Sequence, residues 1–247
     1  MKIFELKCEA YLKSDIDLKN SFDVLSKFIN HSIYKNEICE QNDKNNHIKN
    51  YCFGNFYPTE SDRIYKKNRV YGFVIRSINE DFIDALSGSL KQNINNSFIS
   101  ILKITKKQIE QFFIKELYTV TPVIVTDKID ESGRQLYWSL DYNGDMIALQ
   151  KQLQNNLKRK LKQFYPEDIE VSNNFIHEIE IRNQKPQSIY FKKFKNSKEQ
   201  LIRLIGNKFA IIPKSDDLSQ KLAFLSLGVG LGEKSSLGGG FCLSRRD

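Results

Sequence analysis

Two successive halves of the chain carry the same order of hydrophobic patterns, and few folds accommodate such an order. In the first half, apolar residues recur at helical spacing over residues 18–33, and Asn79 is placed to cap a second helix. Alternating apolar residues predict four strands, at residues 4–10, 48–57, 69–78 and 97–104. The resulting strand–helix–strand–strand–helix–strand order is typical of a ferredoxin-like unit.

The second half repeats this order less regularly. Its longest amphipathic helix is expected over residues 144–164, and a later helix carries Leu218, Leu222 and Leu225. Strands are expected at residues 117–125, 134–140, 174–182, 187–193, 201–212 and 241–243. The sequence therefore predicts an α+β protein of two tandem ferredoxin-like (RRM-like, βαββαβ) domains, residues 1–112 and 113–247. A single mixed α+β domain with one larger sheet is the alternative.

Composition limits the class of protein and its partners. The chain has 247 residues, of which 40% are hydrophobic, so it can bury two cores, and no apolar run is long enough to span a bilayer. A formal net charge of +8 favours nucleic acid or another anionic partner, although lysine-rich proteins are also common in AT-rich genomes. The four cysteines are scattered, as in proteins of a reducing cytoplasm. We therefore expect a cytoplasmic protein that does not associate with membranes.

Residues 228–241 (GVGLGEKSSLGGGF) form the most distinctive segment of the chain. Glycine lets the backbone approach a polyanion closely and present N–H groups to it. The P-loop is excluded because Glu233 separates Gly232 from Lys234, and the dinucleotide fingerprint is excluded because Ser235 stands where a glycine is required. The glycines alone fit either a phosphate-binding loop or a terminal hairpin loop.

The same segment and several others carry a resemblance to a known family. Residues 230–240 match a glycine-rich pattern G-h-G-x5-G-h-G. The stretches KNYCFGNFYP, VTPVIV, LQNNLKRKLKQF and KLAFLSLG precede it in the order of an aromatic strand, a Ser-Pro strand, an "NL..K" helix and a final helix. Together these segments resemble the CRISPR RNA-processing endoribonucleases of the RAMP superfamily, whose fold is a pair of ferredoxin-like domains.

That resemblance implies the activity and the partners. The family cuts the repeats of a CRISPR transcript into guide RNAs without metal, by attack of a ribose 2′-OH that leaves a 2′,3′-cyclic phosphate. It implies a metal-independent endoribonuclease that binds CRISPR repeat RNA and uses no cofactor. Other CRISPR effector subunits and a second copy of the chain are further candidate partners. Two alternatives stay open: a catalytically silent RNA-binding subunit of the same superfamily, and a general single-stranded RNA binder.

The candidate catalytic residues are His47, His31, Tyr34 and Lys49. Histidine is the usual general acid or base near neutral pH. His47 precedes the aromatic strand, where the family commonly places its catalytic histidine, and Lys49 follows closely. His31 is the alternative, because it falls opposite the apolar stripe of the first helix and some relatives carry a histidine there. Tyr34 is a candidate to orient the nucleophile or to bind phosphate.

The candidate RNA-binding residues belong to three basic or glycine-rich segments. They are Lys151, Lys158, Arg159, Lys162, Lys192, Lys193, Gly230, Gly232, Lys234, Ser235, Ser236, Gly238 and Gly240. Ammonium and hydroxyl groups of the loop are suited to phosphate. The helix lysines fit a solvated outer face equally well. No metal-ligand motif is present in the sequence.

Overall fold

The computed structural model describes residues 1–35, 49–142, 144–165, 174–195 and 198–245. The helices are α1 Leu18–Tyr34, α3 Glu80–Gln92, α4 Met146–Phe164 and α5 Asp217–Val229, with a short 3-10 turn, η1 Ser235–Leu237. The strands of the two main sheets are β1 Lys2–Leu12, β3 Tyr51–Phe53, β5 Val70–Ser77, β6 Ile99–Glu110, β7 Glu116–Thr119, β10 Ile176–Ile181, β13 Phe209–Pro213 and β14 Cys242–Arg245. None of the described helices is long and apolar enough to cross a lipid bilayer.

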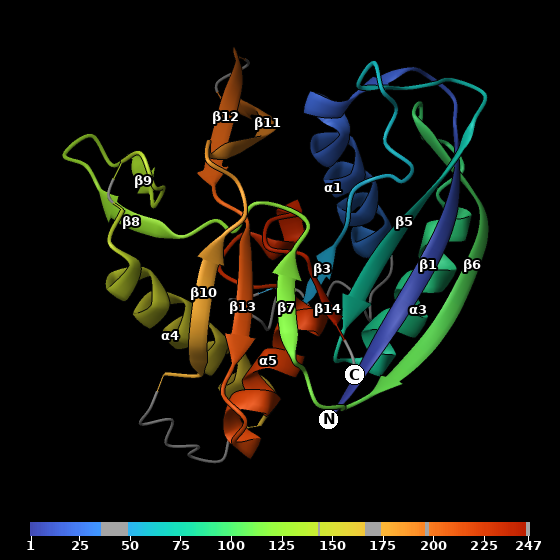
Figure 1. The fold of residues 1–247 in the computed structure, drawn as a ribbon. Coiled ribbons are helices and arrows are strands. Elements are labelled where there is room, and N and C mark those ends of the chain that lie inside the picture. The colour runs from blue at the N-terminus through green and yellow to red at the C-terminus, as the bar shows by residue number, and fades with distance from the viewer. Residues whose placement is uncertain (36–48, 143, 166–173, 196–197, 246–247) are drawn as a thin grey trace.

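The first sheet has the antiparallel strand order β3-β5-β1-β6. Its apolar face is covered by α1 and α3, so that side chains such as Leu6 and Ile75, which face each other in the register, share a core with Phe28 and Leu86. The predicted cap at Asn79 is confirmed, because its side chain accepts a hydrogen bond from the backbone N–H of Phe82 at 3.0 Å. Figure 1 shows this unit with β1 crossing in front of α3.

The second sheet has the order β10-β13-β7-β14, also antiparallel. Leucines of α4 and α5 pack with Phe209 and Ile211 of β13 in one core. In both sheets the second and third strands pair, the first strand is central, and the fourth lies beside it, which is the ferredoxin-like arrangement. The fold prediction is therefore confirmed. The division at residues 112 and 113 falls between β6 and β7 and stays a prediction.

The two sheets are joined through α5 and the segment that follows it. Helix α5 contacts β1, β3 and β5 of the first sheet as well as β13 and β14 of the second. Arg76 of β5 makes a buried ion pair with Glu5 (Nε to Oε2, 2.7 Å) and also donates to the carbonyl of Cys242 at 2.9 Å. The segment between α5 and β14 therefore lies where the two units meet.

Two hairpins stand outside the main sheets: β11 Gln187–Lys195 with β12 Lys198–Gly206, and β8 Thr126–Ile129 with β9 Gln135–Tyr137. The prediction of one strand over residues 201–212 is wrong, because β12 ends at Gly206 and β13 begins after a break. A Cβ atom on Gly206 would lie 2.0 Å from the carbonyl oxygen of Val123, and the side chain of Asn207 accepts from Leu140 N at 3.2 Å. A short pair, β2 Ile16–Asp17 with β4 Ile64–Tyr65, closes the start of α1.

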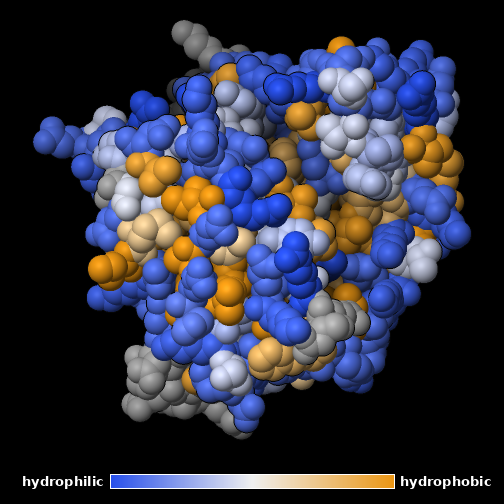
Figure 2. Space-filling view, viewed as in Figure 1, coloured by the Kyte–Doolittle hydropathy of each residue, from blue (hydrophilic) through white to orange (hydrophobic). Residues whose placement is uncertain are grey.

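The β11–β12 hairpin packs beside α1, which places part of the second half of the chain against the first (Figure 1). Figure 2 shows the same face as mainly hydrophilic, with apolar patches separated by polar side chains.

Candidate functional site

The glycine loop, residues 230–240, is folded back on itself between α5 and β14. The N–H of Leu231 donates to the carbonyl of Gly240 at 2.9 Å, and that of Glu233 donates to the carbonyl of Ile124 at 2.7 Å. Several loop N–H groups are thus used by carbonyls of the protein. This differs from the expectation that the glycine backbone is presented to a polyanion.

The four glycines predicted to bind RNA are buried and have positive φ: Gly230, Gly232, Gly238 and Gly240. Their surroundings leave no room for a side chain. A Cβ atom on Gly240 would lie 1.8 Å from the carbonyl oxygen of Leu231, and one on Gly238 would lie 2.3 Å from a ring carbon of Phe22. Both the backbone conformation and the close packing require glycine. Their burial gives these glycines a role in packing of the loop, and their predicted contact with RNA stays a prediction.

Lys160 of α4 lies beneath the loop and was missed by the sequence analysis. Its Nζ donates to the carbonyls of Val229 at 3.2 Å, Gly230 at 2.8 Å and Gly232 at 2.8 Å. Burial lowers the pKa of this lysine to about 8. The signal was present in the sequence, because a residue seven positions after Leu153 returns to the apolar side of the helix.

A cavity of about 400 Å³, called the loop cavity below, opens beside the glycine loop. It is lined by Lys49, Asn156, Arg159, Lys160, Gly232, Glu233, Lys234, Ser235 and Ser236. The carboxylate of Glu233 accepts a hydrogen bond from the hydroxyl of Thr126 at 2.7 Å. Cationic side chains outnumber this single carboxylate, so the cavity has the electrostatic character of a phosphate site.

Asn156 adds a neutral polar group to the loop cavity. Its residue is 6% exposed, and its Oδ1 atom has no hydrogen-bond partner among the residues that the structure describes. Buried amide oxygens are normally paired, so this oxygen is a polar group beside the cavity for which the described residues supply no donor. Ser235 and Ser236 contribute hydroxyls to the same lining.

One side of α1 contacts the loop. The hydroxyl of Ser26 donates to the carbonyl of Ser236 at 3.4 Å, and Asn30 donates to that hydroxyl at 3.3 Å. The hydroxyl of Tyr51 in β3 donates to Asn30 at 3.2 Å. Tyr34 is 60% exposed, and because it follows Asn30 by four residues and His31 by three, it lies between these two residues on the helix surface. Its expected role in orienting the nucleophile or binding phosphate stays a prediction.

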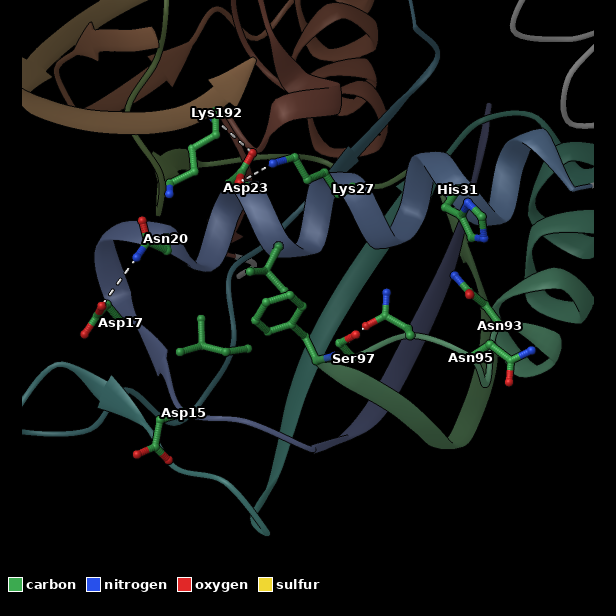
Figure 3. Close-up of a pocket in the computed structure, with 14 residues that line it drawn as sticks. Asp15, Asp17, Asn20, Asp23, Lys27, His31, Asn93, Asn95, Ser97 and Lys192 are labelled. Carbon is green, nitrogen blue, oxygen red and sulfur yellow. Dashed lines mark hydrogen bonds and ion pairs between the residues drawn. The ribbon is translucent and has the colours of Figure 1, made fainter. Parts of the chain in front are cut away.

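His31 lies on a different side of α1, in a second cavity of about 620 Å³, called the α1 cavity. This cavity is lined by Asp15, Ile16, Asp17, Asn20, Asp23, Val24, Lys27, His31, Asn93, Asn95, Asn96, Ser97, Phe98 and Lys192. Figure 3 shows His31 projecting from α1 on the side of Asn93, one turn beyond the ion pair of Lys27 with Asp23 at 2.7 Å. His31 and the loop cavity are thus separated by the body of the helix.

The remaining predicted residues are distributed over α4 and β11. Lys151, Lys158 and Lys162 lie on α4, and Arg159 is the predicted RNA-binding residue of this helix that lines the loop cavity. Lys192 lines the α1 cavity and pairs with Glu199 at 3.0 Å, and Lys193 is exposed beside it. His47 lies outside the described residues; in the sequence it precedes Lys49 by two positions.

Three solved structures of similar fold cover nearly the whole chain. A "CRISPR associated protein Cas6" matches with a TM-score of 0.71 at 20% identity, covering 99% of this chain and 100% of the other. "An RAMP protein binding different RNA substrates" matches with 0.70 at 15% identity, covering 98% and 100%. A Cas6-related protein from Pyrococcus furiosus also matches with 0.70 at 15% identity, covering 99% and 99%. At these identities the likeness shows a shared fold.

The sequence itself gives the family. No curated protein sequence matches significantly. The family model "CRISPR associated protein Cas6, C-terminal" matches residues 104–243, which is more than half of the chain and includes β7, β10, β13, the start of β14, α4 and the whole glycine loop. The chain belongs to the Cas6 family of CRISPR-associated proteins.

Proposed function

We propose that this protein is a metal-independent endoribonuclease that binds CRISPR repeat RNA and cuts the precursor transcript into guide RNAs. The observation that carries the proposal is the loop cavity, where Lys49, Arg159 and Lys234 converge from three separate segments. Membership of the Cas6 family supplies the substrate class, and the RNA substrates of the similarly folded RAMP protein agree with it. The described cysteines are free thiols, which fits the cytoplasm as the compartment.

The chemistry suits a site built from cations and one proton carrier. The ribose 2′-OH is adjacent to the scissile phosphate, so correct positioning supplies the nucleophile without an activated water. The 2′ oxygen forms a bond to phosphorus while the bond from phosphorus to the 5′ oxygen breaks. A base accepts the 2′-OH proton and an acid protonates the departing 5′ oxygen. The negative charge that develops on the phosphoryl oxygens is stabilised by the cations of the loop cavity.

We assign the proton-transfer role to His47 and supporting roles to Tyr34 and Lys49. Lys49 lines the loop cavity and follows His47 by two positions, and Tyr34 stands at the end of α1, before the segment that contains His47. Tyr34 is proposed to orient the 2′-OH or to bind the phosphate. The position of His31 in the α1 cavity argues against a catalytic role for this residue.

RNA binding is assigned to the loop cavity and the adjacent surface of α4. Arg159, Lys234 and Ser236 are proposed to contact phosphates, and Asn156 to accept from a ribose hydroxyl through Oδ1 or to donate to phosphate through Nδ2. Lys151, Lys158 and Lys162 extend the positive surface along α4. Stable association with other CRISPR subunits or with a second copy of the chain is a separate part of the proposal, which size-exclusion chromatography can test.

The deciding experiment is cleavage of a transcript containing the matching repeat in the presence of EDTA. We expect one cut per repeat and a fragment that carries a 2′,3′-cyclic phosphate, identified by mass spectrometry. RNA with a 2′-deoxyribose at the cut position should remain intact while binding normally. Binding without cleavage would overturn the enzymatic assignment in favour of a silent RNA-binding subunit. Equal affinity for unrelated single-stranded RNA would favour a general RNA binder.

A further inference from the structure

Lys160 differs from the other cations of the loop cavity because it is buried beneath the glycine loop, with 2% of its surface exposed. Its Nζ atom donates to three carbonyl oxygens, those of Val229, Gly230 and Gly232, at 3.2, 2.8 and 2.8 Å. An ammonium has three N–H donors, so this set of acceptors satisfies it completely.

Burying the ammonium of Lys160 costs free energy, and its hydrogen bonds show which part of the structure it stabilises in return. Burying an ammonium costs free energy that an apolar side chain of similar size would avoid. Two of its acceptors, Val229 and Gly230, lie at the C-terminus of α5, where carbonyls carry partial negative charge. The third acceptor is the carbonyl of Gly232, so one ammonium is bonded to both ends of the first turn of the glycine loop. The direction in which the chain leaves α5 is thereby fixed.

That direction determines where the RNA-facing part of the loop lies. Lys234, Ser235 and Ser236 follow the third acceptor by two to four positions and line the loop cavity. Gly230 and Gly232 have positive φ, and because glycine tolerates several backbone paths, contacts of the surrounding protein must select this one. The backbone N–H groups of Leu231 and Glu233 make two of these contacts, and Lys160 binds the carbonyls of both glycines. The only side chain that the described structure shows donating to both carbonyls is that of Lys160.

We propose that Lys160 is a positioning residue: its ammonium holds the first turn of the glycine loop so that Lys234, Ser235 and Ser236 face the loop cavity, and affinity for RNA depends on this hold. The ligand is the ribose-phosphate backbone of RNA. The proposal deepens the proposed function and depends on it for the identity of that ligand.

The charge of Lys160 changes within an accessible pH range. Burial, reinforced by Arg159 on the same helix, lowers the pKa of Lys160 to about 8, while the carboxylate of Glu233 in the loop acts in the opposite direction. Burial raises the pKa of the neighbouring thiols, Cys52 on β3 and Cys242 on β14, to about 12, so both are neutral in this pH range. Lys160 should therefore lose much of its charge between pH 7 and pH 9.

As pH rises and Lys160 loses its proton, affinity for RNA should fall while the free energy of unfolding should rise. Loss of the charge loosens the loop, so RNA affinity falls as pH rises through about 8. The folded-state pKa is below the value for an unfolded lysine, about 10.4. The unfolded chain therefore binds more protons between pH 8 and 10, and on account of Lys160 the free energy of unfolding rises with pH. If Lys160 contributed to stability alone, RNA affinity and the free energy of unfolding would not change in opposite directions.

The experiment compares Lys160→Met with Lys103→Met, which removes one lysine charge from an exposed position on β6. Dissociation constants are measured at pH 7 and pH 9 with repeat RNA that carries a 2′-deoxyribose at the cut position, and melting temperatures are measured in parallel. At pH 7 we expect Lys160→Met to bind about tenfold or more weakly, and Lys103→Met to bind within about twofold of wild type. Between pH 7 and 9, affinity should fall in wild type and in Lys103→Met but stay constant in Lys160→Met.

A double-mutant cycle with Lys234→Ala tests the route of the effect. If Lys160 acts by placing the loop, the double variant should bind little worse than the weaker of the two single variants. Additive losses, or a wild-type affinity that does not change between pH 7 and 9, would overturn the proposal. If Lys160→Met does not fold, hydrogen exchange of the loop in wild type at pH 7 and pH 9, described next, keeps the hold of Lys160 on the loop testable.

Hydrogen exchange without RNA separates this proposal from the proposed function. Exchange of amides in residues 231–240, corrected for the intrinsic pH dependence, should be faster in Lys160→Met than in Lys103→Met, and in wild type should be faster at pH 9 than at pH 7. Unchanged loop exchange would overturn the role of Lys160 even if RNA is bound and cut. Faster loop exchange in a protein that binds no repeat RNA would instead show the hold to be real and the proposed function wrong.

Discussion

The loop cavity and the α1 cavity lie against different sides of the same helix and differ in charge. Lysine and arginine side chains outnumber the single carboxylate of the loop cavity, and that carboxylate is hydrogen-bonded to Thr126. Three aspartates line the α1 cavity with two lysines, and Asp23 is already paired with Lys27 at 2.7 Å. A polyanion is therefore attracted to the first cavity and not to the second.

This difference shows that a histidine does not by itself locate a catalytic centre. His31 lines the α1 cavity together with three aspartates, although a histidine was the expected mark of the catalytic centre. Tyr34 follows His31 by three residues and Asn30 by four, so on the helix surface it lies between these two residues. The converging cations of the loop cavity are the reason for proposing that the catalytic centre lies there and not at His31. The predictions below test whether all RNA chemistry belongs to the loop cavity.

The largest effect is expected from the histidines. His47→Ala should lower the single-turnover cleavage rate by about 10²- to 10⁴-fold, because it removes the proton-transfer group, while affinity for the 2′-deoxy repeat RNA stays close to wild type. The matched variant His31→Ala should cleave at a rate within about threefold of wild type. A large loss in His31→Ala with normal cleavage in His47→Ala would transfer the chemistry to the α1 cavity.

The second largest effect is expected from substitution of a glycine in the glycine loop, which borders the loop cavity. In Gly240→Ala the new methyl group meets the carbonyl of Leu231 at a φ of 65°, so the free energy of unfolding should fall by at least about 2 kcal/mol. The control is Gly88→Ala in α3, where a Cβ atom meets nothing within 4 Å. That variant should be stabilised by about 0.5–1 kcal/mol. Urea unfolding followed by circular dichroism measures both changes.

Equal stability of the two glycine variants would contradict the packing role assigned to the loop glycines. A Gly240→Ala protein that is destabilised but binds RNA normally would show that the path of the loop tolerates more variation than its contacts suggest.

Removing one cation from each cavity in turn tests whether RNA binding depends on the charges of the loop cavity and not on those of the α1 cavity. Lys234→Ala or Arg159→Ala should weaken binding of repeat RNA about tenfold, since each removes a charge-assisted contact to phosphate. The slope of the logarithm of the binding constant against the logarithm of salt concentration should fall by about 0.7 for each variant. Lys27→Ala, from the α1 cavity, should change neither quantity. A similar loss in all three variants would mean that binding follows net charge and not the loop cavity.

Much of the fold could be predicted because short-range patterns in the sequence determine many of its helices and strands. The alternation along β1, the apolar spacing in α1 and the cap at Asn79 are short-range signals, and each corresponds to an element of the structure. The region 201–212 failed because its break depends on contacts distant in sequence: Gly206 lies against Val123, and Asn207 is bonded to Leu140. A continuous apolar alternation cannot reveal that a strand leaves one sheet and enters another.

The site was predicted less completely for the same reason. Lys234 and Arg159 were found because charge in a glycine-rich or basic segment is visible in sequence, and both line the loop cavity. Lys160 was not among the candidates, which were chosen from the charged outer face of the helix, although its position on the apolar side was the available signal. The choice between His31 and His47 stays open at the sequence level because it depends on how α1 is rotated against the loop.

The smallest effect is expected from Asp23→Asn in the α1 cavity. The substitution removes the partner charge of Lys27, but such an ion pair four residues apart on a helix contributes only about 0.3–0.5 kcal/mol. The amide oxygen of asparagine can still accept from the backbone N–H of Lys192, so the contact between α1 and β11 is kept. Stability and RNA affinity should both remain within about twofold of wild type in the corresponding equilibrium constants. If loss of this one carboxylate instead raises RNA affinity about tenfold, the α1 cavity must lie on the RNA path, and its carboxylates must act as a repulsive boundary that shapes which strand segments reach the loop cavity.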